Sequence, residues 1–285
     1  MTPAEVLSAR ALDPFCGNGV LATINQLADF SHSKTMADLI TEGKWRVELL
    51  LTLGKVAPPR YANFIGRFRD DPDVSVRQAV AVALGLIDNE ATSVPLLIHL
   101  LARGDQAEDF LVKWEAANSL VAVARRRGAD GVRRRLIELS EDKNGMTVAL
   151  AARALTGTGD ARGLVKLRQL ATHGDPRVRQ EAVLALGEAA DQGARETVTR
   201  RLKDDNLAVR ACAVYALGRI GGPSTIPALR KAVGESLDYE KELHRRKQRG
   251  EDPRALDEKS GRGEFDLRET LQEAITAAQK AGRRP

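Results

Sequence analysis

A ten-residue pattern recurs along the chain and limits its fold more than any other feature. Three clear copies read VRQAVAVALG, VRQEAVLALG and VRACAVYALG, and they begin at residues 76, 178 and 209. Weaker copies begin at residues 45, 113 and 147, so neighbouring copies start 31 to 37 residues apart. Regular self-similarity at such a period is typical of a protein built from stacked structural repeats.

Each copy has apolar residues at helical spacing, which predicts an amphipathic helix. Most copies end near a glycine, which we interpret as the stop signal of that helix. A second apolar segment lies between copies and predicts a second helix, as in Thr92–Ala102, Gly131–Leu139, Arg162–Ala171 and Arg195–Leu202. Two antiparallel helices per period predict an all-α fold, an α-solenoid of about seven helical hairpins with the patterned helix second in each pair.

The sequence around one clear copy extends the pattern to D-P-x-V-R-x-x-A-x-x-A-L-G, from Asp175 to Gly187. This frame resembles HEAT repeats of the short bacterial type, also called phycobilisome-lyase-like HEAT repeats. The resemblance covers most of residues 45–282 and implies that the predicted hairpins are HEAT-like. Repeats of this type occur in chromophore lyases, a hydroxylase, DNA-repair solenoids and adaptor proteins, so the resemblance implies a fold and no single function.

The pattern divides the chain into four parts. Residues 1–43 lack it and are predicted to form an N-terminal helical cap, which a solenoid needs for solubility. Residues 44–234 hold the HEAT-like repeats, and residues 264–285 hold a last repeat helix, LRETLQEAIT, followed by a tail. A charged insertion occupies residues 235–263. Long loops in compact folds are functional or disordered, so flexibility and partner binding both stay open for the insertion.

An arginine recurs at the second position of the pattern, with an acidic or amide residue four residues before it. Such a residue can cap the helix start, and the arginine can bond the cap of its own or the neighbouring repeat. We predict a structural ladder that keeps the repeats in register; a row of phosphate-binding arginines is the alternative. Trp114 and Val148 interrupt this row. Its arginines are Arg46, Arg77, Arg179, Arg210 and Arg268, and the residues before them are Glu42, Asp73, Asp175, Asn206 and Glu264.

The third and seventh positions of the pattern lie one turn apart on the helix face that points away from the core-facing positions. The HEAT resemblance implies that this face lines the concave surface of the solenoid. The strip is apolar to neutral, as the centres of protein interfaces are. Burial of Val47 and Leu51 under the N-terminal cap is an alternative for part of the strip. The predicted partner-binding residues are Val82, Arg153, Leu184 and Tyr215.

No motif indicates catalysis, and we expect no catalytic residue, metal site or cofactor. Residues Asp13–Gly19 resemble the glycine-rich loop of S-adenosylmethionine-dependent DNA methyltransferases, but no βαβ units follow, so a turn is the simpler interpretation. The four histidines lack metal-site spacing, and no His-Glu step occurs, unlike in deoxyhypusine-hydroxylase-type HEAT proteins.

The charge balance gives weak support to a nucleic-acid partner. Lys and Arg total 44 against 39 Asp and Glu, a surplus of only five positive charges, and nucleic-acid binders concentrate such charge in a patch. No apolar stretch approaches the roughly 18 residues of a membrane span. The two cysteines, Cys16 and Cys212, predict free thiols in a reducing compartment, and we expect a cytoplasmic protein.

The sequence therefore predicts a non-catalytic scaffold or adaptor that binds another protein along the concave face of a HEAT solenoid. Two alternatives stay open: an enzyme subunit like the phycobilin lyases, and a nucleic-acid-binding solenoid.

Overall fold

A computed structural model describes residues 33–43, 45–104, 107–232, 245, 248, 249 and 268–281. This part of the chain consists of helices and the turns between them and contains no strand. The prediction of an all-α fold built from stacked HEAT-like hairpins is confirmed. The helices belong to two compact units, Met1–Gly159 and Asp160–Pro285, each of which is described by itself.

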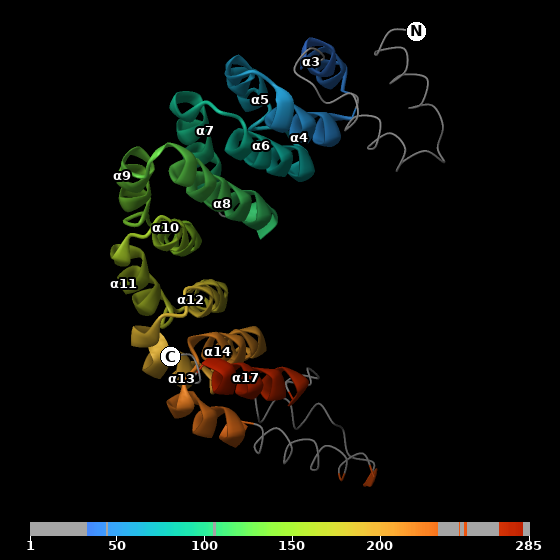
Figure 1. The fold of residues 1–285 in the computed structure, drawn as a ribbon. Coiled ribbons are helices and arrows are strands. Elements are labelled where there is room, and N and C mark those ends of the chain that lie inside the picture. Colours follow the sequence, from blue (N-terminus) through green and yellow to red (C-terminus); the bar gives the residue numbers. More distant parts are fainter. Residues whose placement is uncertain are drawn as a thin grey trace. The chain divides into compact units, whose positions relative to one another are not determined.

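The first unit has two layers of helices (Figure 1). The first helices of its hairpins form one layer, and the patterned second helices form the other, where α4 packs on α6, α6 on α8 and α8 on α10. The apolar core lies between the layers. The first-helix layer holds α5 (Ala62–Gly66), α7 (Glu90–Ala102) and α9 (Asp130–Leu139); the second-helix layer holds α4 (Arg46–Val56), α6 (Val74–Leu86), α8 (Phe110–Arg127) and α10 (Gly145–Gly157); α3 (Ser33–Thr41) packs on α4.

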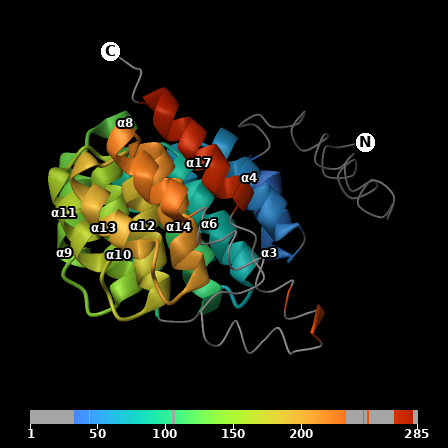
Figure 2. The same ribbon diagram turned by 90° about the horizontal axis from the view of Figure 1, so that it is seen from below.

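The second unit repeats this arrangement. Its first helices are α11 (Ala161–Leu170) and α13 (Arg195–Arg201), and its second helices are α12 (Pro176–Glu188), α14 (Leu207–Ile220) and α17 (Arg268–Ala281). Figure 2 shows α17 beside α14, and the two helices are in contact. Residues 226–232 are also helical. The last copy of the pattern, LRETLQEAIT, therefore packs as the next second helix of this unit.

Short turns of 3-10 helix precede several of these helices, at η2 (Pro59–Tyr61), η3 (Ala107–Asp109), η4 (Gln192–Ala194) and η5 (Pro223–Thr225). The predicted cap before residue 33 lies outside the described residues. So does the predicted insertion at 235–263, apart from three of its residues.

Short polar side chains begin most second helices, as predicted. A side-chain oxygen of Asp73 accepts a hydrogen bond from the Ser75 amide at 2.8 Å, and Asp175 accepts one from the Arg177 amide at 2.8 Å. Asn206 begins α14 in the same way. The prediction that Glu42 caps the first patterned helix is wrong. Helix α4 begins at Arg46, and its N-cap residue is Trp45, whose side chain makes no cap hydrogen bond.

The glycine at position ten of the pattern is part of the helix, so its interpretation as a stop signal is wrong. Helix α4 continues past Gly54 to Val56, and α14 continues past Gly218 to Ile220. A Cβ atom at Gly54 would stand 2.6 Å from the Ala83 Cα, which belongs to the next second helix. The glycine is there because two helix backbones approach each other more closely than a side chain allows.

Substitution of Gly187 by alanine sets two effects on stability against each other. Alanine favours the helix, but its Cβ would clash with the neighbouring helix. A Cβ at Gly187 would stand 2.5 Å from the Ala216 Cα, which is backbone and cannot move aside locally. We expect Gly187→Ala to lower the free energy of unfolding by about 1–3 kcal/mol, as overpacking does. Alanine is otherwise favoured over glycine in a helix by about 1 kcal/mol.

The matched control is Gly131→Ala in α9, where a Cβ would meet only the Glu90 Oε1 atom at 3.3 Å, at the end of a flexible side chain. This control should be neutral or slightly stabilising. Urea unfolding measures both variants, and equal stabilisation by both would show that the helices do not need the glycine.

Candidate functional site

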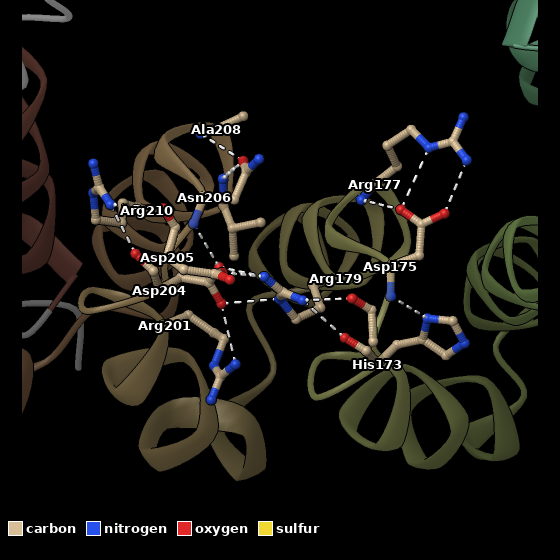
Figure 3. A network of polar contacts seen from close by, with 12 residues as sticks. His173, Asp175, Arg177, Arg179, Arg201, Asp204, Asp205, Asn206, Ala208 and Arg210 are labelled. Atoms are coloured by element: carbon tan, nitrogen blue, oxygen red, sulfur yellow. Dashed lines mark hydrogen bonds and ion pairs between the residues drawn. The ribbon is translucent and has the colours of Figure 1, made fainter. Parts of the chain in front are cut away.

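A buried arginine joins two neighbouring repeats of the second unit (Figure 3). The Arg179 guanidinium donates from Nε to Asp204 Oδ2 at 3.0 Å and from Nη2 to Asp204 Oδ1 at 2.6 Å. Nη2 also donates to Asp205 Oδ1 at 2.5 Å. Nη1 donates to the carbonyl oxygens of His173 and Gly174, each at 3.0 Å. One side chain thus ties the turn before its own helix to the turn before the next second helix.

The first unit contains the same arrangement at Arg77. Its Nη2 and Nε donate to Asp109 Oδ1 at 2.6 and 3.1 Å, and its Nη1 donates to the carbonyl oxygens of Asp71 and Pro72 at 2.8 and 2.9 Å. The Asp109 residue is also the N-cap of α8, so Arg77 bonds the cap residue of the neighbouring repeat. At the preceding repeat, Arg46 Nη1 donates to Asp71 Oδ2 at 3.2 Å.

The other two arginines of the predicted ladder are described in part. Arg210 Nη1 donates to the carbonyl oxygens of Asp204 and Asp205 at 2.8 and 3.3 Å, so it too bonds the turn before its own helix. Arg268 is the first residue of α17, and its side chain lies outside the described part of the chain. Arg77, Arg179 and Arg210 are all buried, which favours the structural role over phosphate binding.

The pattern in α8 begins at residue 112, one residue earlier than predicted. Lys113 is buried and donates from Nζ to Thr147 Oγ1 of the next second helix at 3.1 Å. It therefore occupies the arginine position, and the copy begins at the buried Val112. The prediction that Trp114 interrupts the row is wrong, because a lysine takes the place of the arginine and Trp114 moves to position three.

Asp204, the acidic partner of Arg179, has a shifted pKa. Burial by itself would raise the pKa of Asp204, whose side chain is only 1% exposed. Hydrogen bonds with Arg179, Asp205 and the Asn206 amide, together with the positive charge of Arg179, outweigh this effect and leave the pKa of Asp204 below its ordinary value. The hydrogen bonds with Asp204 raise the pKa of Arg179. The pair is therefore charged at neutral pH, and its charges stabilise the folded state.

The four predicted partner-binding residues occupy position seven of their second helices. Positions three and seven of the second helices together are called the second-helix strip. In the first unit, Val82 of α6 is half-buried. Arg153 of α10 stacks on α8, with its Cζ 5.5 Å from the centre of the Trp114 ring. In the second unit, Leu184 of α12 is half-buried and Tyr215 of the adjacent α14 is 41% exposed. The structure thus brings Arg153 to Trp114 and places Leu184 and Tyr215 on neighbouring helices.

The strip is not uniformly accessible. Ala149, at position three of α10, is fully buried. Val47 and Leu51 of α4 are half-buried and pack against the core of the first unit. Position three of α10 therefore adds no accessible surface to the strip, whereas the other strip residues at positions three and seven of that unit are half-buried. Sequence reasoning missed Trp114 as a strip residue, and the small residue at position eight, Ser119, would have given the correct register.

Arginines of the first-helix layer and of helix ends bond the ends of neighbouring helices. Arg126 donates to the Gly85 carbonyl oxygen, and Arg133 donates to the Thr158 carbonyl oxygen. Arg168 forms a two-pronged bond with Asp191, with both distances 2.6 Å. A cation at a helix C-terminus also complements the helix dipole. The positive charges of these three arginines are therefore used within the repeats.

Other candidate reactive groups do not assemble into a site. Burial, together with the charge of Glu181, raises the pKa of the Cys212 thiol to about 11, so the thiol is protonated at neutral pH. Nδ1 of His173 accepts a hydrogen bond from the Asp175 amide. Within the described residues, no three His, Cys, Asp or Glu side chains could together hold a metal ion. The glycine-rich segment at 13–19, Cys16, His32 and His244 lie outside the described residues.

Removal of the Arg179 side chain should destabilise the second unit strongly. Arg179→Ala leaves the buried carboxylate of Asp204 without its cation, and loss of one partner of a buried ion pair is destabilising by about 3–5 kcal/mol. Arg179→Lys should recover only part of this stability, because an ammonium group lacks the planar fork that bonds a carboxylate and two carbonyls together. Chemical denaturation monitored by circular dichroism measures both variants. Unchanged stability of Arg179→Ala would contradict a structural role.

Acid should remove the contribution of the Arg179–Asp204 ion pair to the free energy of unfolding. A carboxyl whose folded-state pKa lies below its unfolded value of about 3.9 stabilises the fold above that pH, and the contribution disappears as the pH falls through the folded pKa. Asp204→Asn should therefore be less stable than the parent at pH 7, and the difference should shrink between about pH 4 and pH 2. Urea unfolding at both ends of this range tests the prediction. A constant difference would show that the Asp204 charge does not contribute.

Comparison with known proteins finds HEAT repeats in part of the chain. A profile for HEAT repeats matches residues 164–242, which include α12 and α14. No curated protein matches the sequence. None of the helices in the described part of the chain has the length and apolar character to cross a membrane.

Several solved structures are similar to the chain. An engineered protein is 22% identical with a TM-score of 0.43, and the match covers 78% of this chain and 97% of that one. The complex of CpcE and CpcF of phycocyanin lyase from Nostoc sp. PCC7120 is 15% identical with a TM-score of 0.42, covering 98% and 95%. Human deoxyhypusine hydroxylase is 17% identical with a TM-score of 0.35, covering 90% and 99%. All three TM-scores are below 0.5. The profile match therefore identifies residues 164–242 of this chain as HEAT repeats.

Proposed function

We propose that this chain is a non-catalytic scaffold or adaptor that binds another protein along its second-helix strip. The observation that carries the proposal is the exposed aromatic ring of Tyr215, which is 41% exposed beside the half-buried Leu184 on the adjacent helix. Tyrosine combines a large apolar surface with a polar hydroxyl and is enriched among the residues that dominate protein interfaces.

The backbone that carries Tyr215 is held rigidly by the residues around it. Its neighbours Val214 and Ala216 are buried in the stack, so the backbone beneath the ring is held rigidly by core packing. A rigid surface loses little conformational entropy on binding, which favours affinity. Successive repeats would present further strip residues to the same partner, as extended solenoid surfaces do.

The use of basic residues supports a protein partner over a nucleic acid. Arg126, Arg133 and Arg168 bond helix ends and turns inside the repeats, and Arg179 is buried in an ion pair. Phosphate binding instead needs several accessible cations along one surface. We place the adaptor in the cytoplasm, in keeping with the free Cys212 thiol.

The paired change Leu184→Glu with Tyr215→Ala tests the proposal. Both side chains lie outside the buried core, so the fold should persist, whereas partner binding should weaken roughly tenfold or more, at about 1.4 kcal/mol per decade. The control is Val165→Glu, which alters another large apolar side chain, 52% exposed on the first helix α11 of the same unit. Quantitative affinity purification from the native host compares the proteins retained by the three chains, and titration with the purified partner follows.

If the Val165→Glu chain loses the partner and the paired variant still binds it, the interface lies on the first-helix layer. That result would contradict the proposal. Neutralisation of the exposed Arg134 and Arg200 should change binding little at physiological salt. A steep loss in that variant, with salt-dependent retention on heparin by the parent, would support a nucleic-acid binder instead.

A further inference from the structure

The second-helix strips of the two units carry different charge. Position eleven lies one turn beyond position seven and extends the strip along each helix. In the first unit, none of positions three, seven and eleven carries a carboxylate, whereas in the second unit three of them are glutamates and one is an arginine. These positions hold Val47, Leu51 and Lys55; Gln78, Val82 and Leu86; Trp114, Asn118 and Ala122; and Ala149, Arg153 and Gly157 in the first unit, and Gln180, Leu184 and Glu188; Ala211, Tyr215 and Arg219; and Glu269, Glu273 and Ala277 in the second.

The first-unit strip has an apolar centre on two helices in direct contact. Leu86, at the end of α6, is 40% exposed, and Val82 one turn before it is half-buried. Trp114 on the adjacent α8 is half-buried, with the Arg153 guanidinium against its ring. Leu86 and Trp114 stand at positions eleven and three of adjacent helices, and large apolar and aromatic side chains of this kind are what interface centres contain.

Two further cations border this centre. Lys55 is exposed in the last turn of α4, and Arg125 is exposed in the last turn of α8. Arg125 follows Trp114 by eleven residues, which places the two on the same face of the helix. No ion pair holds Lys55 or Arg125 among the residues that the structure describes. The nearest acids in the pattern, Glu48 and Glu115, are half-buried at position four, about 100° around the helix from position three.

We infer that the first-unit strip binds an acidic amphipathic helix of the partner protein. An apolar helix face would lie on Val82, Leu86 and Trp114, and carboxylates beside that face would meet Lys55 and Arg125. Helix-in-groove recognition works through apolar anchors at helical spacing, and complementary charge selects the partner and speeds association. The inference rests on the proposed adaptor function and adds the chemistry of the segment that is bound.

A selection from a displayed library of random helical peptides tests this inference with the full chain as bait. We expect the enriched peptides to combine aspartate or glutamate with large apolar residues at helical spacing. A fluorescein-labelled copy of the most enriched peptide is then titrated by fluorescence anisotropy at physiological salt. In a Trp45→Phe background, Trp114 is the remaining one of the chain's two tryptophans, and its emission should change on binding.

Leu86→Glu and the pair Lys55→Glu with Arg125→Glu should each weaken peptide binding roughly tenfold or more. The milder pair Lys55→Gln with Arg125→Gln should weaken binding less and reduce its salt dependence, which preserves the test if the charge reversals unfold the chain. The matched control is Val165→Glu on the first helix α11, which alters another large exposed apolar side chain and should leave peptide affinity unchanged. The pair Leu184→Glu with Tyr215→Ala, the second-unit variant, is measured beside it to locate the site. Circular dichroism checks that each variant is folded.

Three results would overturn the inference. Enrichment of neutral or basic peptides would contradict the charge argument. Loss of acidic-peptide binding only in the second-unit variant would move the site and leave the proposed adaptor function standing. Binding that survives the changes in both units would contradict the strip as the interface and the proposed function together.

Discussion

The guanidinium at position two of the repeat pattern is the interaction on which the stacking depends. In both units it donates to two carbonyl oxygens of the turn before its own helix and to a carboxylate in the turn before the next second helix. Arg77 and Asp109 are 7% and 5% exposed, and Arg179 and Asp204 are 9% and 1% exposed. A buried charge with one partner removed is strongly destabilising, so each arginine requires its neighbouring repeat to be in place.

This requirement acts together with close helix packing. The position-ten glycines admit the backbone of the next second helix at Ala83 and Ala216, and a slip of one residue would bring a larger side chain to that contact. The arginine sets the register at one end of the helix pair, and the glycine sets the spacing at the other. The outcome is a rigid second-helix layer in each unit, and rigidity is what lets residues such as Tyr215 and Trp114 act as fixed interface anchors.

The sequence was sufficient to predict the helices, their pairing and the arginine position, because each depends on local spacing that repeats many times. It failed where a single repeat departs from the pattern. A lysine in place of the arginine shifted the predicted register in α8 by one residue and hid Trp114 from the strip. The role of Gly54 and Gly187 could not be read from local propensity, because it depends on a helix that lies about thirty residues further along the chain. The burial of Ala149 and the stacking of Arg153 on Trp114 likewise depend on contacts between helices.

A double-mutant cycle measures whether the position-two arginine links neighbouring repeats. The cycle combines Arg77→Ala with Asp109→Asn and is compared with a cycle at the exposed pair Arg135 and Glu138, whose side chains are 58% and 55% exposed. Urea unfolding gives the coupling energy of each pair. We expect a coupling of about 2 kcal/mol or more for Arg77 with Asp109, within the range for contacting residues of one network. For the exposed pair we expect about 0.5 kcal/mol or less. Equal couplings in the two cycles would show that the buried arginine does not hold the repeats together.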